Sequence, residues 1–331
     1  MAAARHATSH RARAGESGTR RETYEVQQTT ADITVDGSAN LAAWILQPAV
    51  SSAAGPAPGV VLVHGAGHGS RESLIEMGRA LASAGLAVII YDKRRTGYSV
   101  LARDYAVLAQ DAIRAADVLA TAPGVDPNRI GILGFSEGGW VAPTAVVAAP
   151  QRFAFLVLAS APNVSPLEQA SWIVENTLAG APHAFRKTAA TALASGRTLV
   201  NYLDFDVRST LADLDLPVYG IWGALDATVP VNVAVRRLIG AAPGPVTVRI
   251  LPNAGHQLPT DTGWEADLAN WIRSPPDIDA DDISGVEPAS AAGVSILPAS
   301  RWYLNPILHT IVSAAVAIAV FVGLSPGPRN T

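Results

Sequence analysis

Short apolar runs alternate with helical patterns along most of this chain, and this alternation constrains the fold more than any other feature. Residues 60–63 read Val-Val-Leu-Val, which is typical of a strand buried on both faces of a sheet. Further strands are predicted at 87–91, 130–135, 155–159, 218–222 and 246–251. Helices are predicted at 71–83, 104–119, 138–148, 231–239 and 265–272. This order predicts an α/β fold with a doubly wound, mostly parallel sheet.

Two further segments complete the predicted domain, which extends from residue 24 to residue 273. Residues 24–35 and 41–46 alternate around a turn at 36–38, which predicts an antiparallel hairpin at one sheet edge. Between 162 and 215 the alternation gives way to helical sequence with several aromatic residues. We interpret this insertion as a cap over the site that excludes water and shapes a pocket. The alternative is a set of surface helices that do not touch substrate.

The two ends of the chain differ from this domain. Residues 1–23 carry five arginines and no apolar stretch, which predicts a disordered basic arm rather than a secretory signal. Residues 274–301, acidic and rich in Pro and Ser, are predicted to be a linker. Residues 302–325 lack charged side chains and are long enough to cross a bilayer of about 30 Å, which predicts a transmembrane helix before a tail at 326–331. The alternative is a helix docked on the domain.

Charge and cysteine content exclude several classes of function. The formal net charge of -4 is small and spread along the chain, so no nucleic-acid-binding surface is indicated. The chain has no cysteine, which excludes disulfides, thiolate catalysis and cysteine-based zinc sites. Without a secretory signal, we expect the domain in the cytoplasm, anchored to the membrane by the C-terminal segment.

The sequence Gly-Phe-Ser-Glu-Gly at 134–138 joins the predicted strand 130–135 to the predicted helix 138–148. This Gly-x-Ser-x-Gly pattern between a strand and a helix is typical of a nucleophilic serine on a tight turn. Gly134 and Gly138 leave the room that such a turn needs, and the helix N-terminus directs N–H groups toward the Ser136 hydroxyl. On its own, the pattern also describes a glycine-rich turn with an incidental serine.

Two residues further along the chain favour the nucleophile. A serine hydroxyl needs a base within hydrogen-bonding reach and a third group that orients the base. His256 follows the predicted strand 246–251, and Asp226 follows the strand 218–222, so both are expected at the carboxyl edge of the sheet. The order Ser136, Asp226, His256 is the order nucleophile, acid, base of the strand–turn–helix hydrolases. The sequence therefore predicts a catalytic triad.

The same chemistry requires an oxyanion hole, which is a pair of N–H donors directed at the tetrahedral intermediate. One donor is predicted to be the backbone N–H of Glu137. The second is expected in the His-Gly-Ala-Gly loop at 64–67, from Ala66 first and Gly67 second. His64 is expected to brace this loop through a hydrogen bond. The Glu137 side chain is expected to face solvent or to sit at the helix N-terminus, and the alternative is that it tunes the site electrostatically.

Several motifs give residues 24–273 a family resemblance. The loop at 64–67, Tyr-Asp-Lys-Arg at 91–94, the segment 125–131 and Phe-Ser-Glu-Gly-Gly at 135–139 resemble those of α/β-hydrolase superfamily serine hydrolases. They are similar to bacterial carboxylesterases and to dienelactone-hydrolase-like and acylaminoacyl-peptidase-like proteins. The resemblance implies the α/β-hydrolase fold. One departure is Arg95, which stands where relatives usually carry the first glycine of Gly-x-Gly-x-Ser, so the conformation of this loop is open.

The triad and the resemblance together imply a serine esterase. Ser136 would accept an acyl group from a small-molecule, lipophilic ester, His256 would act as the base, and water would hydrolyse the acyl-enzyme. This chemistry needs no metal or organic cofactor. A peptidase or thioesterase with the same triad is one alternative, and a non-catalytic, membrane-anchored binding module is another.

Overall fold

The computed structural model describes residues 23–37, 39–49, 55–99, 101–178, 188, 200–260, 262–274 and 282–285. Within these ranges nine strands form one sheet in the order β1-β2-β4-β3-β5-β6-β7-β8-β9. Their bounds are β1 Val26–Val35, β2 Ala39–Pro48, β3 Ala57–Val63, β4 Ala87–Tyr91, β5 Val125–Phe135, β6 Leu156–Ala159, β7 Val218–Gly223, β8 Val246–Leu251 and β9 Asp282–Gly285. β1 and β2 are antiparallel, as is the pair β2 and β4, and the other neighbours are parallel.

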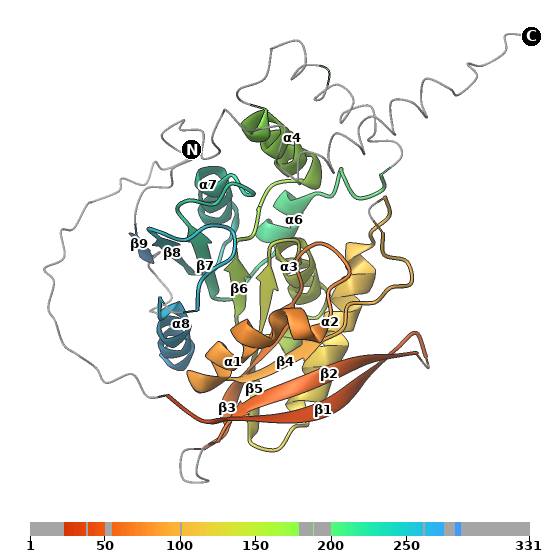
Figure 1. Ribbon diagram of the computed structural model, residues 1–331, viewed down its shortest axis with the longest axis vertical. Helices are drawn as coiled ribbons and strands as arrows, with labels where there is room; N and C mark the ends of the chain where they lie inside the picture. Colours follow the sequence, from red (N-terminus) through yellow and green to blue (C-terminus); the bar gives the residue numbers. More distant parts are fainter. Residues whose placement is uncertain are drawn as a thin grey trace, which may run out of the picture.

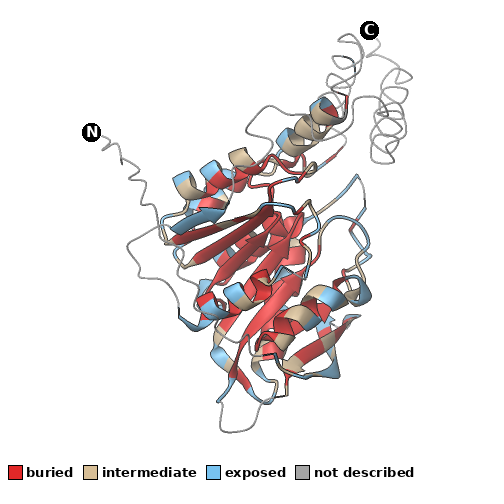
Figure 2. Ribbon diagram, turned by 60° about the vertical axis from the view of Figure 1, so that its left-hand side comes forward, coloured by how far each residue is buried: buried red, intermediate tan, exposed pale blue. Residues whose placement is uncertain are grey.

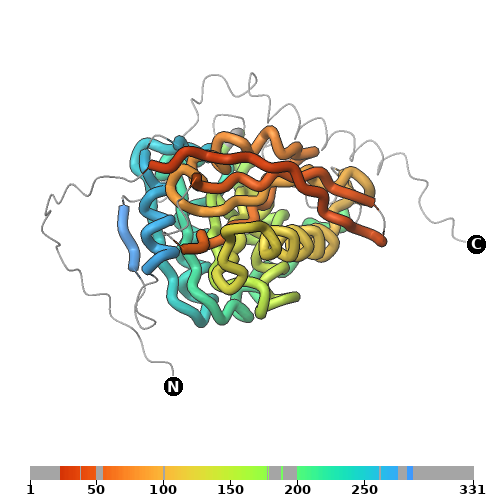
Figure 3. Tube along the Cα trace, turned by 90° about the horizontal axis from the view of Figure 1, so that it is seen from below, coloured from red at the N-terminus to blue at the C-terminus, as the bar shows by residue number. Residues whose placement is uncertain are grey.

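This arrangement is the predicted doubly wound sheet with its N-terminal hairpin. The hairpin lies at one edge, seen from below in Figure 3 with β1 in red. The central strands are apolar and buried along their length: every residue of β3, β4 and β7 is buried (Figure 2). Strands covered on both faces read as continuous apolar runs, which is why they could be recognised in the sequence.

Helices cover both faces of the sheet (Figure 1). The described helices are α1 Ile75–Ser83, α2 Tyr105–Ala120, α3 Gly138–Ala148, α4 Pro166–Thr177, α6 Val207–Ala212, α7 Val231–Ala241 and α8 Trp264–Arg273, with short 3-10 turns at Arg71–Leu74 and Pro150–Arg152. Helices α1 and α8 contribute to one apolar core, whereas α2, α3, α6 and α7 contribute to the other. The sheet therefore separates two cores, as a three-layer fold requires.

The predicted cap at 162–215 is described in part. Helix α4 begins with a capping box, in which the Ser165 hydroxyl accepts from the Glu168 N–H and the Glu168 carboxylate accepts from the Ser165 N–H. Glu168 also forms a two-pronged ion pair with Arg237 of α7, at 2.8 and 3.0 Å. These contacts tie α4 to the end of the molecule that carries α7 (Figure 1).

The linker from 274 to 301 stays a prediction, and within it the structure describes residues 282–285, for which no strand was predicted. They form the edge strand β9, parallel to β8, and Arg249 of β8 pairs with Asp282 at 2.6 Å. The four residues are exposed, and backbone pairing rather than apolar burial holds them, so the side-chain pattern carried no signal. In the described ranges no helix is long and apolar enough to cross a membrane. Residues 1–22 of the predicted arm at 1–23, the predicted transmembrane segment at 302–325 and the predicted tail at 326–331 lie outside the described residues, and all three stay predictions.

Candidate active site

Ser136 lies on the turn that joins β5 to α3, and its backbone has the left-handed φ of 52°. The Ser136 N–H donates to the Ala159 carbonyl at the end of β6, 2.9 Å away. A Cβ atom at Gly134 would lie 2.2 Å from the Gly138 carbonyl oxygen, and one at Gly138 would lie 2.7 Å from the Val63 carbonyl oxygen. Both positions therefore require glycine, and a strained serine is held at the tip of the turn.

The structure brings the three predicted triad residues together. His256 Nε2 lies 2.9 Å from Ser136 Oγ, and His256 Nδ1 lies 2.9 Å from Asp226 Oδ2. Asp226 is fully buried, and its other oxygen accepts from the Thr228 and Val229 N–H groups at 2.7 and 3.0 Å. A carboxylate in this position favours the tautomer with a proton on Nδ1, which leaves Nε2 free to accept the serine proton.

The sheet register explains how residues far apart in sequence meet. Ser136 follows β5, Asp226 follows β7 and His256 follows β8, and these strands are parallel, so their carboxyl ends share one edge. Ser160, which sequence reasoning missed, adds a support for His256. Its hydroxyl donates to the His256 carbonyl oxygen at 2.8 Å, and its own φ is 48°. A single serine after an apolar run gave no signal of this role.

The loop at 64–67 packs against the serine turn because β3 pairs with β5, with Val63 opposite Gly134. A Cβ atom at Gly65 would lie 3.3 Å from the Ser136 Cβ atom, so the two segments are in close contact. The Gly67 N–H donates to the Tyr98 hydroxyl at 3.0 Å. Among the hydrogen bonds formed within the described residues, none has the Ala66 or Glu137 N–H as its donor. Of the three predicted oxyanion donors, Gly67 is thus already engaged.

His64 is buried and its Nε2 atom is hydrogen-bonded to the Tyr91 carbonyl. Burial lowers the pKa of His64 to about 4, so the imidazole is neutral at neutral pH and Nε2–H is the donor. This hydrogen bond ties the start of the 64–67 loop to the end of β4. His64 therefore makes the bracing contact that was expected of it.

Glu137 is the N-cap residue of α3, which was one of the two expectations, but its side chain does not face solvent, which was the other. It is 2% exposed, and its carboxylate accepts hydrogen bonds from Lys93 Nζ at 2.8 Å, from the Tyr98 hydroxyl at 2.7 Å and from Arg103. Lys93 Nζ also donates to the Gly65 carbonyl at 2.6 Å. Lys93, Tyr98 and Arg103 thus surround the carboxylate from the segment after β4, a long-range contact that the local sequence around Glu137 could not indicate.

A cavity of about 790 Å³ borders the site. Phe135, the residue before Ser136, lines it together with Gly65 and Ala66 of the loop. Much of the remaining wall comes from the 3-10 turn before α1, from α1 and from the chain after His256. It is mixed in character: Leu74, Met77, Leu258 and Pro259 are apolar, whereas Ser73, Glu76, Gln257 and Thr260 are polar. No Lys or Arg occurs among the described residues that line it. Among all the residues that the structure describes, no group of three or more His, Asp or Glu side chains is placed to hold a metal ion.

Comparison with known proteins gives a consistent result. The model of the alpha/beta hydrolase family matches residues 60–270. An uncharacterised protein of Mycobacterium tuberculosis is 33% identical over 226 residues, which cover 68% of this chain and 71% of that protein. Two solved structures are a dienelactone hydrolase from Anabaena variabilis (TM-score 0.52, 20% identity, 75% of this chain and 97% of that one) and an esterase from Exiguobacterium antarcticum (TM-score 0.53, 17% identity, 74% and 100%).

Proposed function

Because the chain belongs to the alpha/beta hydrolase family, we propose that it is a serine hydrolase that cleaves carboxylic esters with Ser136, His256 and Asp226. The observation that carries the proposal is the unbroken hydrogen-bond chain from the Ser136 hydroxyl through His256 to the buried Asp226. A serine with an oriented base is the arrangement that nucleophilic acyl transfer requires.

Acylation begins when Ser136 Oγ attacks the ester carbonyl carbon while its proton moves to His256 Nε2. The imidazolium that forms is stabilised by Asp226, which keeps its negative charge. Negative charge develops on the former carbonyl oxygen, and the N–H groups of Glu137 and Ala66 are the proposed donors to it. The N-terminus of α3, which begins at Gly138, adds partial positive charge on the same side.

The tetrahedral intermediate then collapses. The bond between the carbonyl carbon and the alkoxy oxygen breaks, and the leaving alcohol takes the proton from His256. Water next attacks the acyl-enzyme with His256 again as base, which releases the acid and restores the Ser136 hydroxyl. Each proton is accounted for by these groups, so the reaction as written consumes only ester and water.

The bordering cavity supports a small or medium, lipophilic substrate. Its volume of about 790 Å³ lies within the range of small-molecule sites, and Leu74, Met77, Phe135, Leu258 and Pro259 give it an apolar side beside its polar groups. Phosphate-bearing substrates such as acyl-CoA are usually held by Arg or Lys, and neither lines the described cavity. This favours a neutral ester over a thioester of coenzyme A.

The test is a substrate panel with one catalytic and one matched variant. Nitrophenyl esters of increasing acyl length, aminoacyl nitroanilides and acyl-CoA are compared for the whole protein, for Ser136→Ala and for Ser83→Ala, a serine at the end of α1. We expect ester turnover to fall roughly 10⁶-fold in Ser136→Ala and to stay unchanged in Ser83→Ala. Faster cleavage of the anilides or of acyl-CoA would replace the esterase with a peptidase or thioesterase, and no turnover of any substrate would favour a binding module.

A further inference from the structure

A buried charge network lies directly behind the proposed oxyanion hole. Glu137 is the centre of the network, and Lys93, Tyr98 and Arg103 donate to its two carboxylate oxygens. The exposed fractions of the Lys93 and Glu137 side chains are 4% and 1%. Burying ion pairs does not in general stabilise a fold relative to apolar packing, so a network of this kind calls for another explanation.

The network forms hydrogen bonds with the 64–67 loop on both sides of Ala66. Before it, Lys93 Nζ donates to the Gly65 carbonyl oxygen at 2.6 Å. After it, the Gly67 N–H donates to the Tyr98 hydroxyl at 3.0 Å, and the same hydroxyl donates to Glu137. Gly65 and Gly67, the residues on either side of Ala66, are therefore both connected to the Glu137 carboxylate, through Lys93 and Tyr98.

The Gly65 contact has a geometric consequence for Ala66. The Gly65 carbonyl and the Ala66 N–H belong to one peptide unit, which is planar and trans, so the two groups point in opposite directions. A lysine that fixes the carbonyl on one side of this plane fixes the direction of the N–H on the other side. Lys93 thus orients the Ala66 N–H without touching it.

Charge favours the same role. A buried carboxylate one residue after Ser136 would disfavour negative charge on the substrate oxygen if it were unpaired. Two cations, Lys93 and Arg103, surround this single carboxylate, so the cluster carries a net positive charge. Arg103 further connects the cluster to the cap segment, because its guanidinium stacks 4.4 Å from the Tyr202 ring centre and its backbone N–H donates to Asn201 Oδ1 at 2.9 Å.

We propose that Lys93, Tyr98 and Glu137 are positioning residues that hold the Ala66 N–H in the direction an oxyanion requires. The inference rests on the proposed function and deepens it, since it says how the second oxyanion donor is fixed. Glu137 then serves twice: its backbone N–H is one proposed donor, and its side chain orients the other through Lys93 and Tyr98.

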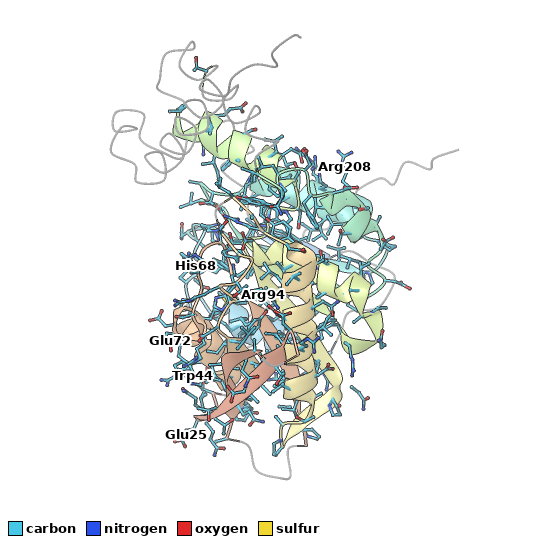
Figure 4. The ribbon with its side chains drawn as sticks, turned by 90° about the vertical axis from the view of Figure 1, so that its right-hand side faces the viewer. Glu25, Trp44, His68, Glu72, Arg94 and Arg208 are labelled. Atoms are coloured by element: carbon cyan, nitrogen blue, oxygen red, sulfur yellow. The ribbon has the colours of Figure 1, made fainter. Side chains whose placement is uncertain are left out.

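The neighbouring residue provides a matched control. Arg94, labelled in Figure 4, is also a largely buried cation. It pairs with the buried carboxylate of Asp111 on α2 at 2.6 Å, and it contacts Asp36 rather than the loop. Lys93→Met and Arg94→Met both remove one cation from one buried carboxylate. Only the first releases the Gly65 carbonyl.

The experiment measures nitrophenyl-ester turnover per active site, with active sites counted by titration with a fluorophosphonate. We expect Lys93→Met to lower kcat per site roughly 10²-fold, the effect of losing one oxyanion donor, with KM within about two-fold of the parent value. The inhibition constant of a trifluoromethyl ketone, which forms a tetrahedral oxyanion on the serine, should rise by the same factor. Arg94→Met should lower thermal stability but keep kcat per site and the inhibition constant.

A second variant keeps the test valid if Lys93→Met does not fold. Tyr98→Phe changes no charge and releases the Gly67 N–H, and we expect about a ten-fold loss of kcat per site at unchanged KM. The inference is overturned if the foldable variants keep kcat per site within two-fold, or if their losses equal that of Arg94→Met. The same titration tests the proposed function separately: if the fluorophosphonate does not label the parent protein, the proposed function is refuted.

Discussion

His64 should make the stability of this protein depend on pH in a defined window. Burial lowers the pKa of His64 to about 4, with Lys93 acting in the same direction and the Tyr91 hydrogen bond, Asp92 and Glu137 opposing. In the unfolded chain the pKa of histidine returns to about 6.5. The unfolded state therefore binds a proton more readily than the folded state. The contribution of neutral His64 to the free energy of unfolding is fully present above pH 6.5 and is lost as the pH falls toward 4.

The size of the effect follows from these two pKa values. Complete titration of His64 corresponds to about 3 kcal/mol, and at pH 5 the loss relative to pH 7 is about 2 kcal/mol. His64 is 3% exposed, so screening by solvent does not reduce this figure substantially. Protonation would place a charge beside Lys93 in a buried loop, which is why the pH effect should be visible in unfolding.

The assay is equilibrium urea unfolding at pH 7, 6 and 5, followed by tryptophan fluorescence, for the parent, His64→Gln and His68→Gln. His68, which directly follows the 64–67 loop, is exposed and serves as the control. Titration of other groups cancels in the differences between proteins. Between pH 7 and pH 5, we expect the free energy of unfolding to fall by about 2 kcal/mol more in the parent than in His64→Gln. The decrease in His68→Gln should equal that of the parent. Parallel curves for the parent and His64→Gln would refute the reasoning.

Three further predictions concern the turn, the triad and the cap. Asp226→Asn should lower kcat roughly 10⁴-fold in ester hydrolysis because the amide does not favour the Nδ1–H tautomer of His256, and a loss under ten-fold would contradict that role. Gly134→Ala should destabilise the protein by about 1 to 3 kcal/mol, since the new methyl group would lie 2.2 Å from the Gly138 carbonyl oxygen; an unchanged Tm would be inconsistent with this turn. Ser165→Ala should cost about 1 kcal/mol in urea unfolding by removing the α4 cap, while Ser209→Ala, which lies inside α6, should cost less.

The fold class and the family resemblance predicted from the sequence are confirmed, and the buried strands explain why. Strands such as β3 and β8 lie in the interior of the sheet, so their apolar runs indicate that they are strands. The limits of β8 were predicted as observed, whereas β3 begins at Ala57, before the apolar run at 60–63. Helix α3, Gly138–Ala148, was placed correctly because the glycine turn marks its start. β9 was missed because backbone pairing at an edge leaves no pattern in the side chains.

The part of the candidate site that could be predicted consists of residues that directly follow parallel strands in the sequence. Ser136, Asp226 and His256 each follow a strand, so the sheet alone brings them to one edge. The surroundings of Glu137 were not predictable. They depend on the path of the loop after β4, where Arg95 replaces the expected glycine and is exposed while Tyr98 turns inward. Contacts between residues 39 or 44 positions apart, such as those from Tyr98 and Lys93 to Glu137, have no local signature.

The central claim is that Ser136 is the nucleophile, and covalent labelling tests it most directly. The whole protein is incubated with a fluorophosphonate, and the adduct is located by intact-protein and peptide mass spectrometry. We predict one adduct per chain, on the peptide that contains Ser136, and none in Ser136→Ala. An adduct on another residue, or equal labelling of Ser136→Ala, would contradict the claim.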